Sequence, residues 1–323
     1  MPGFATHYFF GERAIPLLSG SKARSRICRH IHSFCLGLQG PDVFYYSLPA
    51  YLSSSGNIGS RIHKQSTLDF LTSMMNIRNH FPDRESREIA DAYICGFMGH
   101  YTLDTYCHPY VFCRTRHMEN RHRSLYDFGR HVFLETAMDQ AMIRRYRNIR
   151  PSAFSPEKTI RLSRKERQVI ARLLQKAIAT AFPDHRVSLF QTHAAIASMQ
   201  LESWLMHDPK GRKKTLLRRI EQRFLGYAVI SPLIPSDTLS MYKDPCNLSH
   251  RGWANPWEPA KKSAESVYDL MDRALPVFCH RIRLYFQTLS QQPDKSMEQM
   301  YHAKNLLYAD LGDCSYDSGL PLK

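Results

Sequence analysis

Apolar side chains recur every three to four residues along most of this chain, with polar positions between them. That period places apolar residues on one face of an α-helix, whereas a half-buried strand alternates with a period of two. Helices are predicted over residues 9–18, 24–38, 66–79, 83–108, 124–147, 163–182, 188–206, 214–227, 260–289 and 297–307. The sequence shows no sustained strand alternation and no internal repeat, so it predicts an all-α fold, a multi-helix bundle.

The helix predicted over residues 83–108 has clear signals at both ends. Asp83 follows Pro82 and is a typical N-cap residue, with acidic residues in the turn after it. Pro109 disfavours helical backbone at the residue before it, so we expect the helix to end near His108.

A long loop is predicted over residues 230–259, which are rich in Pro, Ser, Asn and Trp. Its side chains His250, Trp253 and Trp257 would either cover a functional cleft or contact lipid, or simply pack against the protein. Packing is favoured because Trp is usually buried.

We expect a single all-helical domain over residues 1–323. Residues 1–150 carry most of the candidate chemistry described below, and the helices of residues 151–323 complete the bundle. A chain of this length buries a substantial core.

The chain is strongly basic, with 44 Lys and Arg against 29 Asp and Glu and a formal net charge of +15. An electropositive surface attracts phosphate-bearing partners, and charge alone does not separate phospholipid from nucleic acid. The basic stretch of residues 210–214, followed by Arg218 and Arg219, is interpreted as a solvated helix face rather than a dedicated binding patch. No apolar run approaches the length that spans a bilayer, so no transmembrane segment is expected.

Eight cysteines occur without a Cys-x-x-Cys pair, and the start of the chain lacks a basic segment followed by an apolar one. We therefore expect a cytoplasmic, reducing location with mostly free, buried thiols. Cys107 and Cys113 flank the candidate site and are expected to pack rather than to bind metal.

Three metal-competent side chains, His100, Asp104 and His108, lie at spacings of four residues, and His131 and Glu135 repeat that spacing further along. On a helix such residues project from one face, so their donor atoms can converge on bound cations. Imidazole and carboxylate without thiolate suit zinc in a site that keeps a position open for water. The pattern indicates metal-assisted hydrolysis.

The helix predicted over residues 124–147, which carries His131 and Glu135, has two further acids, Asp127 and Asp139, and these have two interpretations. Either one would accept a hydrogen bond from a zinc-binding histidine, or both belong to a solvated acidic stripe.

Further candidates precede these residues: His7, Asp42 after Gly-Pro, and His63. Each alone has an ordinary explanation, as a hydrogen-bonded histidine or a turn residue. As an ordered set over roughly residues 1–140, however, they resemble the zinc-dependent phospholipase C family, which shares its tri-zinc helical fold with the S1/P1-type nucleases. The resemblance implies a helical bundle of the phospholipase C / P1 nuclease type.

The resemblance also implies how zinc ions would be held. One would be bound by Asp42, His63, His100 and a bridging Asp104. A second would be bound by His108, His131 and Glu135. The third would take Asp104, His7 and the amine and carbonyl of the terminal residue.

At this last ligand the chain departs from the family, whose members usually expose a Trp amine after a signal is removed. Here Met1 precedes Pro2, so removal of Met1 would free the Pro2 amine five residues before His7. We expect mature Pro2 to complete the third zinc site, giving two or three zinc ions in all.

Three functions remain open. The first is a phospholipase C that cleaves a phospholipid through metal-activated hydroxide, with peripheral membrane contact and with Asp42 as general base. Tyr45 and Tyr46 would then line the head-group pocket or belong to the core. The second is a nuclease of the S1/P1 type, and the third is a non-catalytic scaffold stabilised by zinc.

Overall fold

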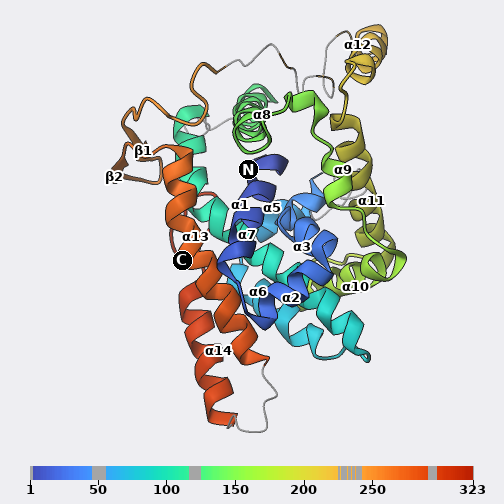
Figure 1. Ribbon diagram of the computed structural model, residues 1–323, viewed down its shortest axis with the longest axis vertical. Helices are drawn as coiled ribbons and strands as arrows, with labels where there is room; N and C mark the ends of the chain where they lie inside the picture. Colours follow the sequence, from blue (N-terminus) through green and yellow to red (C-terminus); the bar gives the residue numbers. More distant parts are fainter. Residues whose placement is uncertain are drawn as a thin grey trace.

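The computed structural model describes residues 3–45, 56–115, 125–224, 242–289 and 297–322, together with residues 226, 231, 234 and 237. Its helices begin with α1 (Phe4–Leu17), α2 (Lys22–Arg29), α3 (Ile31–Gly37), η1 (Gly40–Phe44), α5 (Ile58–Ile62), α6 (Thr67–Arg78), α7 (Arg84–Thr115) and α8 (Leu125–Arg147). They continue with η2 (Pro151–Ala153), α9 (Pro156–Thr159), α10 (Arg164–Ala181), α11 (Leu189–Met206), α12 (Arg212–Phe224), α13 (Val267–Thr288) and α14 (Met297–Leu311). The prediction of an all-α fold is confirmed (Figure 1).

Helix α7 is the central element, because α1, α3, α8, α10 and α13 all pack against it. Its middle residues Tyr93, Phe97 and Met98 are completely buried. Gly96 lets α3 approach closely, since a Cβ there would lie 2.1 Å from the carbonyl oxygen of Phe34. Helix α7, which carries His100, Asp104 and His108, is thereby held in the interior, and the burial of its apolar side chains stabilises this position.

The predicted end of this helix at His108 is wrong, because α7 continues through Pro109 to Thr115. A proline inside a helix lacks the N–H that would bond the carbonyl four residues earlier, here that of Thr105. The backbone at Gly319 covers that carbonyl, and a Cβ on Gly319 would lie 2.2 Å from the Thr105 oxygen. A distant segment therefore packs over the backbone group that Pro109 leaves without its helical partner. The predicted start is confirmed, because Asp83 Oδ1 accepts a hydrogen bond of 2.9 Å from the Ser86 N–H.

The single helix predicted over residues 24–38 is also wrong, because His30 separates α2 from α3 with φ −119° and ψ 46°. Because of this break, α2 and α3 point in different directions, and polar side chains of the two bond to different helices. Arg26 of α2 pairs with the buried carboxylate of Asp91 on α7. Ser33 of α3 donates a hydrogen bond of 2.9 Å to Glu166 on α10.

The segment predicted as a loop contains β1 (Trp253–Asn255), which pairs antiparallel with β2 (Glu258–Ser263). The predicted helix from residue 260 is therefore wrong at its start, and α13 begins at Val267. Its N-terminus is set by Ser266 and Asp269, which form a reciprocal capping box. Residues 258–263, just before it, form strand β2 of the hairpin instead.

The tryptophans of the segment 230–259 pack against the protein, as the favoured interpretation predicted. The indole N–H of Trp253 donates to the Glu265 carbonyl at 3.0 Å, and its ring meets Tyr110 edge-on. Trp257 meets Phe112 with ring centroids 4.9 Å apart. His250 is exposed at the surface of this segment.

Among the helices that the structure describes, none combines the length and the apolar character needed to cross a bilayer.

Candidate metal centre

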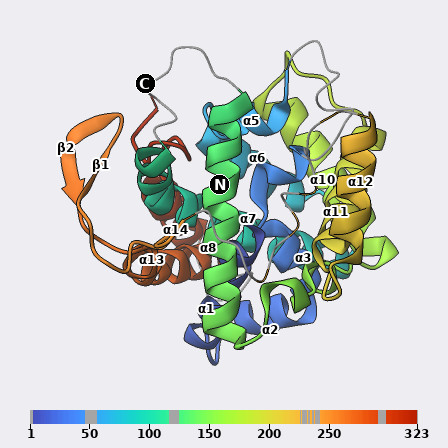
Figure 2. The same ribbon diagram turned by 90° about the horizontal axis from the view of Figure 1, so that it is seen from above.

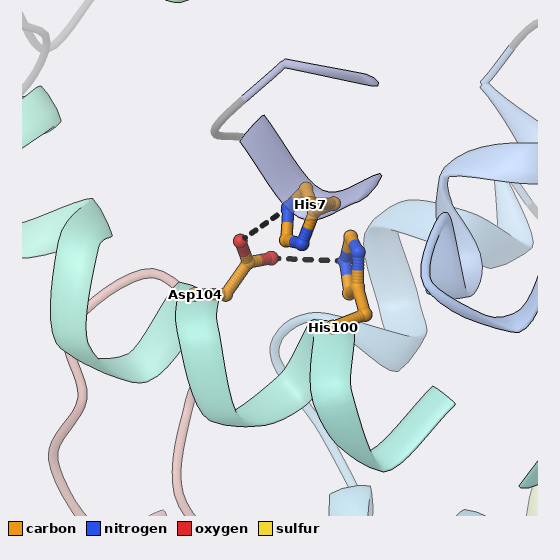
Figure 3. Close-up of side chains that lie close together, drawn as sticks. All are labelled: His7, His100 and Asp104. Carbon is orange, nitrogen blue, oxygen red and sulfur yellow. Dashed lines mark ion pairs between the residues drawn. The ribbon is translucent and has the colours of Figure 1, made fainter. Parts of the chain in front are cut away.

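Helix α7 presents His100, Asp104 and His108 on one face at successive turns, toward the N-terminal helix α1. Figure 3 shows the carboxylate of Asp104 beside the rings of His7 and His100, paired with both. Its Oδ1 lies 3.2 Å from His7 Nε2, and its Oδ2 lies 2.9 Å from His100 Nε2. The rings of His7 and His100 are stacked 4.2 Å apart. These three buried side chains form one group whose donor atoms converge as a metal site requires.

A second convergent group consists of Asp42, His63 and His100. Asp42 lies in η1 and His63 caps α5, so two short helices bring these residues to α7. Asp42 Oδ1 lies 3.3 Å from His63 Nε2 and 3.8 Å from His100 Nε2. His100 therefore belongs to both groups.

The third group joins His108 of α7 to His131 and Glu135 of α8. His131 Nε2 lies 2.9 Å from Glu135 Oε1. Asp104 connects this group to the others, because its Oδ1 lies 3.6 Å from His108 Nε2 and its Oδ2 lies 3.7 Å from His63 Nε2. One carboxylate thus faces all three groups.

The hydrogen bonds of the histidines suit metal binding. The Nδ1 atoms of His63, His100 and His108 lie 2.7, 3.1 and 2.9 Å from the carbonyl oxygens of Gly59, Leu38 and Tyr316. Each of these rings would then hold its proton on Nδ1 and turn a free Nε2 lone pair toward the centre. Within the described part of the chain, those three Nε2 atoms and both oxygens of Asp104 have no hydrogen-bond partner although they are buried. Buried polar atoms without partners are costly, and bound cations would satisfy them.

The pKa values of His7, His108 and Asp104 favour neutral imidazoles around an ionised acid, whereas that of His100 shifts the other way. Burial lowers the pKa of His7 to about 4 and that of His108 well below its usual value. Burial alone would raise the pKa of Asp104, but the neighbouring His100, His108 and His7 bring it well below its usual value. Burial also opposes protonation of His100, yet the charges of Asp104 and Asp42 outweigh it and raise the pKa. Neutral imidazole and ionised carboxylate are the forms that bind zinc.

Gly40 is required where η1 meets α7. Its φ is +52°, a conformation that favours glycine, and a Cβ there would lie 2.3 Å from the ring of His100. Any side chain at this position would displace the imidazole that two groups share.

Neither of the two interpretations offered for Asp139, a partner of a zinc-binding histidine or part of a solvated stripe, describes what the structure shows. Asp139 instead binds the first turn of α1, accepting hydrogen bonds from the Ala5 and Thr6 N–H groups at 2.9 and 2.8 Å and from the Thr6 hydroxyl at 2.7 Å. A carboxylate at a helix N-terminus satisfies donors that lack helical partners. Asp139 thereby fixes the helix that carries His7 and acts on the centre through the backbone. Asp127 lies in α8, and its side chain is outside the described part of the chain.

The C-terminal segment also reaches the centre, which the sequence did not reveal. Tyr316 accepts the His108 hydrogen bond through its carbonyl, and its buried ring lies 4.9 Å from the ring of His63. Asp317 Oδ1 lies 3.8 Å from His108 Nδ1. Neither residue has a spacing relation to the other candidates, so only the folded chain relates them to the site.

Five other residues named in the sequence analysis remain. Tyr45 lies beside the centre, with its hydroxyl 3.4 Å from His63 Nδ1. Pro2 and Tyr46 fall outside the described residues. Cys107 is buried and Cys113 half-buried, and neither belongs to a convergent group among the described residues.

The model of the family described as zinc dependent phospholipase C matches residues 6–191, which is more than half of the chain. The match includes every candidate ligand from His7 to Glu135. Searches among curated proteins and among solved structures found no match.

Proposed function

The chain belongs to the zinc-dependent phospholipase C family, and on this premise we propose that it hydrolyses a phosphodiester, releasing the phosphorylated head group of a phospholipid. The observation that carries the proposal is the position of Asp104, whose buried carboxylate faces three convergent groups of histidine and acid. A scaffold stabilised by one ion needs only one such group. Several cations around one carboxylate suit phosphodiester cleavage, in which charge builds up on several oxygens.

The residues that would hold two or three zinc ions are His7, Asp42, His63, His100, Asp104, His108, His131 and Glu135, with Pro2 as the N-terminal ligand. When bound, zinc lowers the pKa of a coordinated water and neutralises charge on the phosphoryl group. The chain supplies the rest. Carbonyls of Gly59, Leu38 and Tyr316 orient three imidazoles, and Asp139 holds α1 in place.

We assign Asp42 as the general base that accepts the proton of the attacking water. Its Oδ1 is buried beside His63 and has no hydrogen-bond partner among the described residues. A base needs such a free lone pair within reach of the reacting proton. We also propose that Tyr45 contacts the substrate, which its half-buried position next to His63 supports.

A nuclease is the second candidate, because aromatic rings lie next to the third group. Phe112 lies 4.9 Å from the ring of His131, and Trp257 lies against Phe112. Aromatic rings near the metals would stack on bases. Phe112 is nearly buried, however, which favours its role in packing.

The eight cysteines are unpaired. Free thiols are typical of a reducing compartment, so we place the protein in the cytoplasm, in contact with membranes at their surface.

The test offers zinc-loaded protein phosphatidylcholine, phosphatidylinositol, single-stranded DNA and a generic phosphodiester side by side. We expect phospholipid hydrolysis, and we expect His100→Ala to abolish it while the circular dichroism spectrum is retained. His302→Ala, at an exposed histidine of α14, is the matched control. Preference for DNA would identify a nuclease instead, and bound zinc without hydrolysis of any substrate would identify a scaffold.

A further inference from the structure

Helix α11 turns an apolar face to solvent. Its exposed positions include Phe190, Leu201 and Trp204, with exposed fractions of 76, 60 and 49%. Their spacings of eleven and three residues place them on one side of the helix, where Ala197 is also exposed. Exposed apolar residues that are contiguous mark an interaction site, whereas scattered ones need no explanation.

Helix α12 adds a second apolar stripe at regular helical spacing. Leu216, Ile220 and Phe224 follow each other at intervals of four residues, with exposed fractions of 60, 46 and 80%. The basic residues of the same helix are Arg212, Lys213, Lys214, Arg218, Arg219 and Arg223. Its one acid, Glu221, is buried and accepts a hydrogen bond from the Ser231 N–H. The exposed surface of α12 therefore carries apolar and basic side chains with the neutral Thr215 and Gln222, and no acidic one.

The two helices are fixed to each other. Lys213 Nζ donates hydrogen bonds of 2.5 and 2.9 Å to the carbonyls of Trp204 and His207. The same ammonium lies 3.6 Å from the centroid of the Trp204 ring. Figure 1 shows α12 above the upper end of α11, and Figure 2 shows both helices on the side of the molecule opposite the β1–β2 hairpin. Phe190, Leu201, Trp204, Leu216, Ile220 and Phe224, with the basic residues of α12, are called the α11–α12 face below.

We propose that the α11–α12 face docks on membranes that contain anionic lipids. A helix with aromatic and aliphatic residues on one side and Lys and Arg beside them lies in the membrane interface, with its apolar side chains among the acyl chains. Basic residues near the surface add attraction to anionic head groups. The interpretation of residues 210–219 as an ordinary solvated face is revised accordingly, because their charges accompany a stripe of exposed apolar side chains.

The composition of the face separates this partner from two others. A second copy of the chain would bring one set of six cations against another, which is unfavourable. Nucleic acid would pair with the arginines and lysines but would leave aliphatic side chains such as Leu216 and Ile220 without an apolar environment. A bilayer surface offers both negative charge and hydrocarbon.

The location of the face fits an enzyme that acts on lipid. Helix α12 projects at the same end of the molecule as α8, which carries His131 and Glu135 (Figure 1). Docking through α12 would therefore bring that end toward the bilayer. The biological purpose of docking rests on the proposed phospholipase activity, but binding itself needs no turnover and is measured separately.

The test is sedimentation with vesicles of phosphatidylcholine, with and without phosphatidylserine. Two triple variants probe the face: L216S/I220S/F224S for the apolar stripe and R218Q/R219Q/R223Q for charge. L306S, at an exposed leucine of α14, is the matched control. We expect wild type and L306S to bind vesicles with phosphatidylserine, and each triple variant to bind at least about tenfold more weakly. Added salt should weaken the binding of wild type.

Activity separates this proposal from the proposed function. Both triple variants should hydrolyse a monomeric short-chain phosphodiester as wild type does, and vesicle lipid more slowly. Equal vesicle binding by wild type and both triple variants would overturn the docking proposal. The docking proposal would also be overturned if the face proved to be a dimer interface, that is, if the same substitutions abolished a dimer. It would likewise be overturned if they abolished DNA binding in a protein that does not bind vesicles. Vesicle binding without hydrolysis of any substrate would overturn the enzyme assignment and leave the docking surface intact.

Discussion

The metal centre and the α11–α12 face invert the usual distribution of polar and apolar groups in opposite directions. At the centre, His7, His100 and Asp104 are completely buried, although ionisable groups normally remain in water. On the α11–α12 face, Phe190 and Phe224 are largely exposed, although aromatic side chains normally lie inside. Each arrangement costs free energy in the isolated chain, and each cost is offset only by a partner. The difference supports both proposals: cations would satisfy the buried polar atoms of the first region, and an apolar, anionic surface would cover the second.

Asp104→Asn tests the buried side of this comparison and should have the largest effect. The amide keeps the shape but loses the charge that all three groups face, so bound zinc and phosphodiesterase activity should both fall. We expect activity to drop by more than about 100-fold, since changes even in residues that only orient metal ligands cost 10–100-fold. Elemental analysis of the purified variant and its turnover of a soluble phosphodiester provide the measurement. Full zinc content with full activity would show that Asp104 is not a zinc ligand.

Glu202→Gln tests whether α11, which carries part of the α11–α12 face, is free of negative charge at neutral pH. Burial raises the pKa of this α11 carboxyl to about 8, against its ordinary value of 4.5, so we expect Glu202 to be mostly protonated in the folded protein at pH 7. A raised pKa stabilises the fold fully below pH 4.5, and this contribution is lost as pH rises through 8. Between these values the free energy of unfolding of wild type should decrease by roughly 4 kcal/mol relative to that of Glu202→Gln.

Denaturant titrations of both proteins at several pH values measure this difference. Glu298→Gln serves as the control, at an exposed glutamate on α14. Parallel pH profiles for wild type and Glu202→Gln would show that Glu202 is ionised at neutral pH and that α11 carries a charge beside its apolar face.

Asp139→Ala tests how the buried side is held in place. The substitution leaves the Ala5 and Thr6 N–H groups without their acceptor, so we expect a loss of about 1–2 kcal/mol in stability, as for other helix caps. Because α1 carries His7, zinc content should fall by at most one equivalent. Asp69→Ala, at an exposed aspartate of α6, is a suitable comparison. A stable variant with unchanged zinc would mean that α1 is positioned by its apolar contacts alone.

Asp317→Asn should have the smallest effect. Asp317 lies 3.8 Å from His108 Nδ1, while the Tyr316 carbonyl lies at 2.9 Å and already orients that ring. We expect zinc affinity to weaken by less than about tenfold, measured by competition with a chelator. A loss as large as that of Asp104→Asn would place Asp317 among the ligands.

The spacing of residues 100, 104 and 108 was enough to predict one face of α7, because helical periodicity is a local property of the backbone. The same holds for the N-cap at Asp83, whose hydrogen bond spans three residues. The helix end at Pro109 was mispredicted because the effect of proline was judged locally, whereas Gly319, far away in the chain, packs over the Thr105 carbonyl in the folded protein. The start of α13 was placed too early because β2 forms only by pairing with β1.

The amino-acid sequence by itself therefore determined the all-α class, the family and the residues capable of binding zinc, since these follow from local period and side-chain chemistry. Only the tertiary structure decided that Asp104 faces three groups, that Asp139 holds α1 rather than a histidine, and that the basic stretch of α12 adjoins exposed apolar side chains. Each of those facts depends on contacts between segments distant in sequence, whose geometry is set by the packing of the whole core.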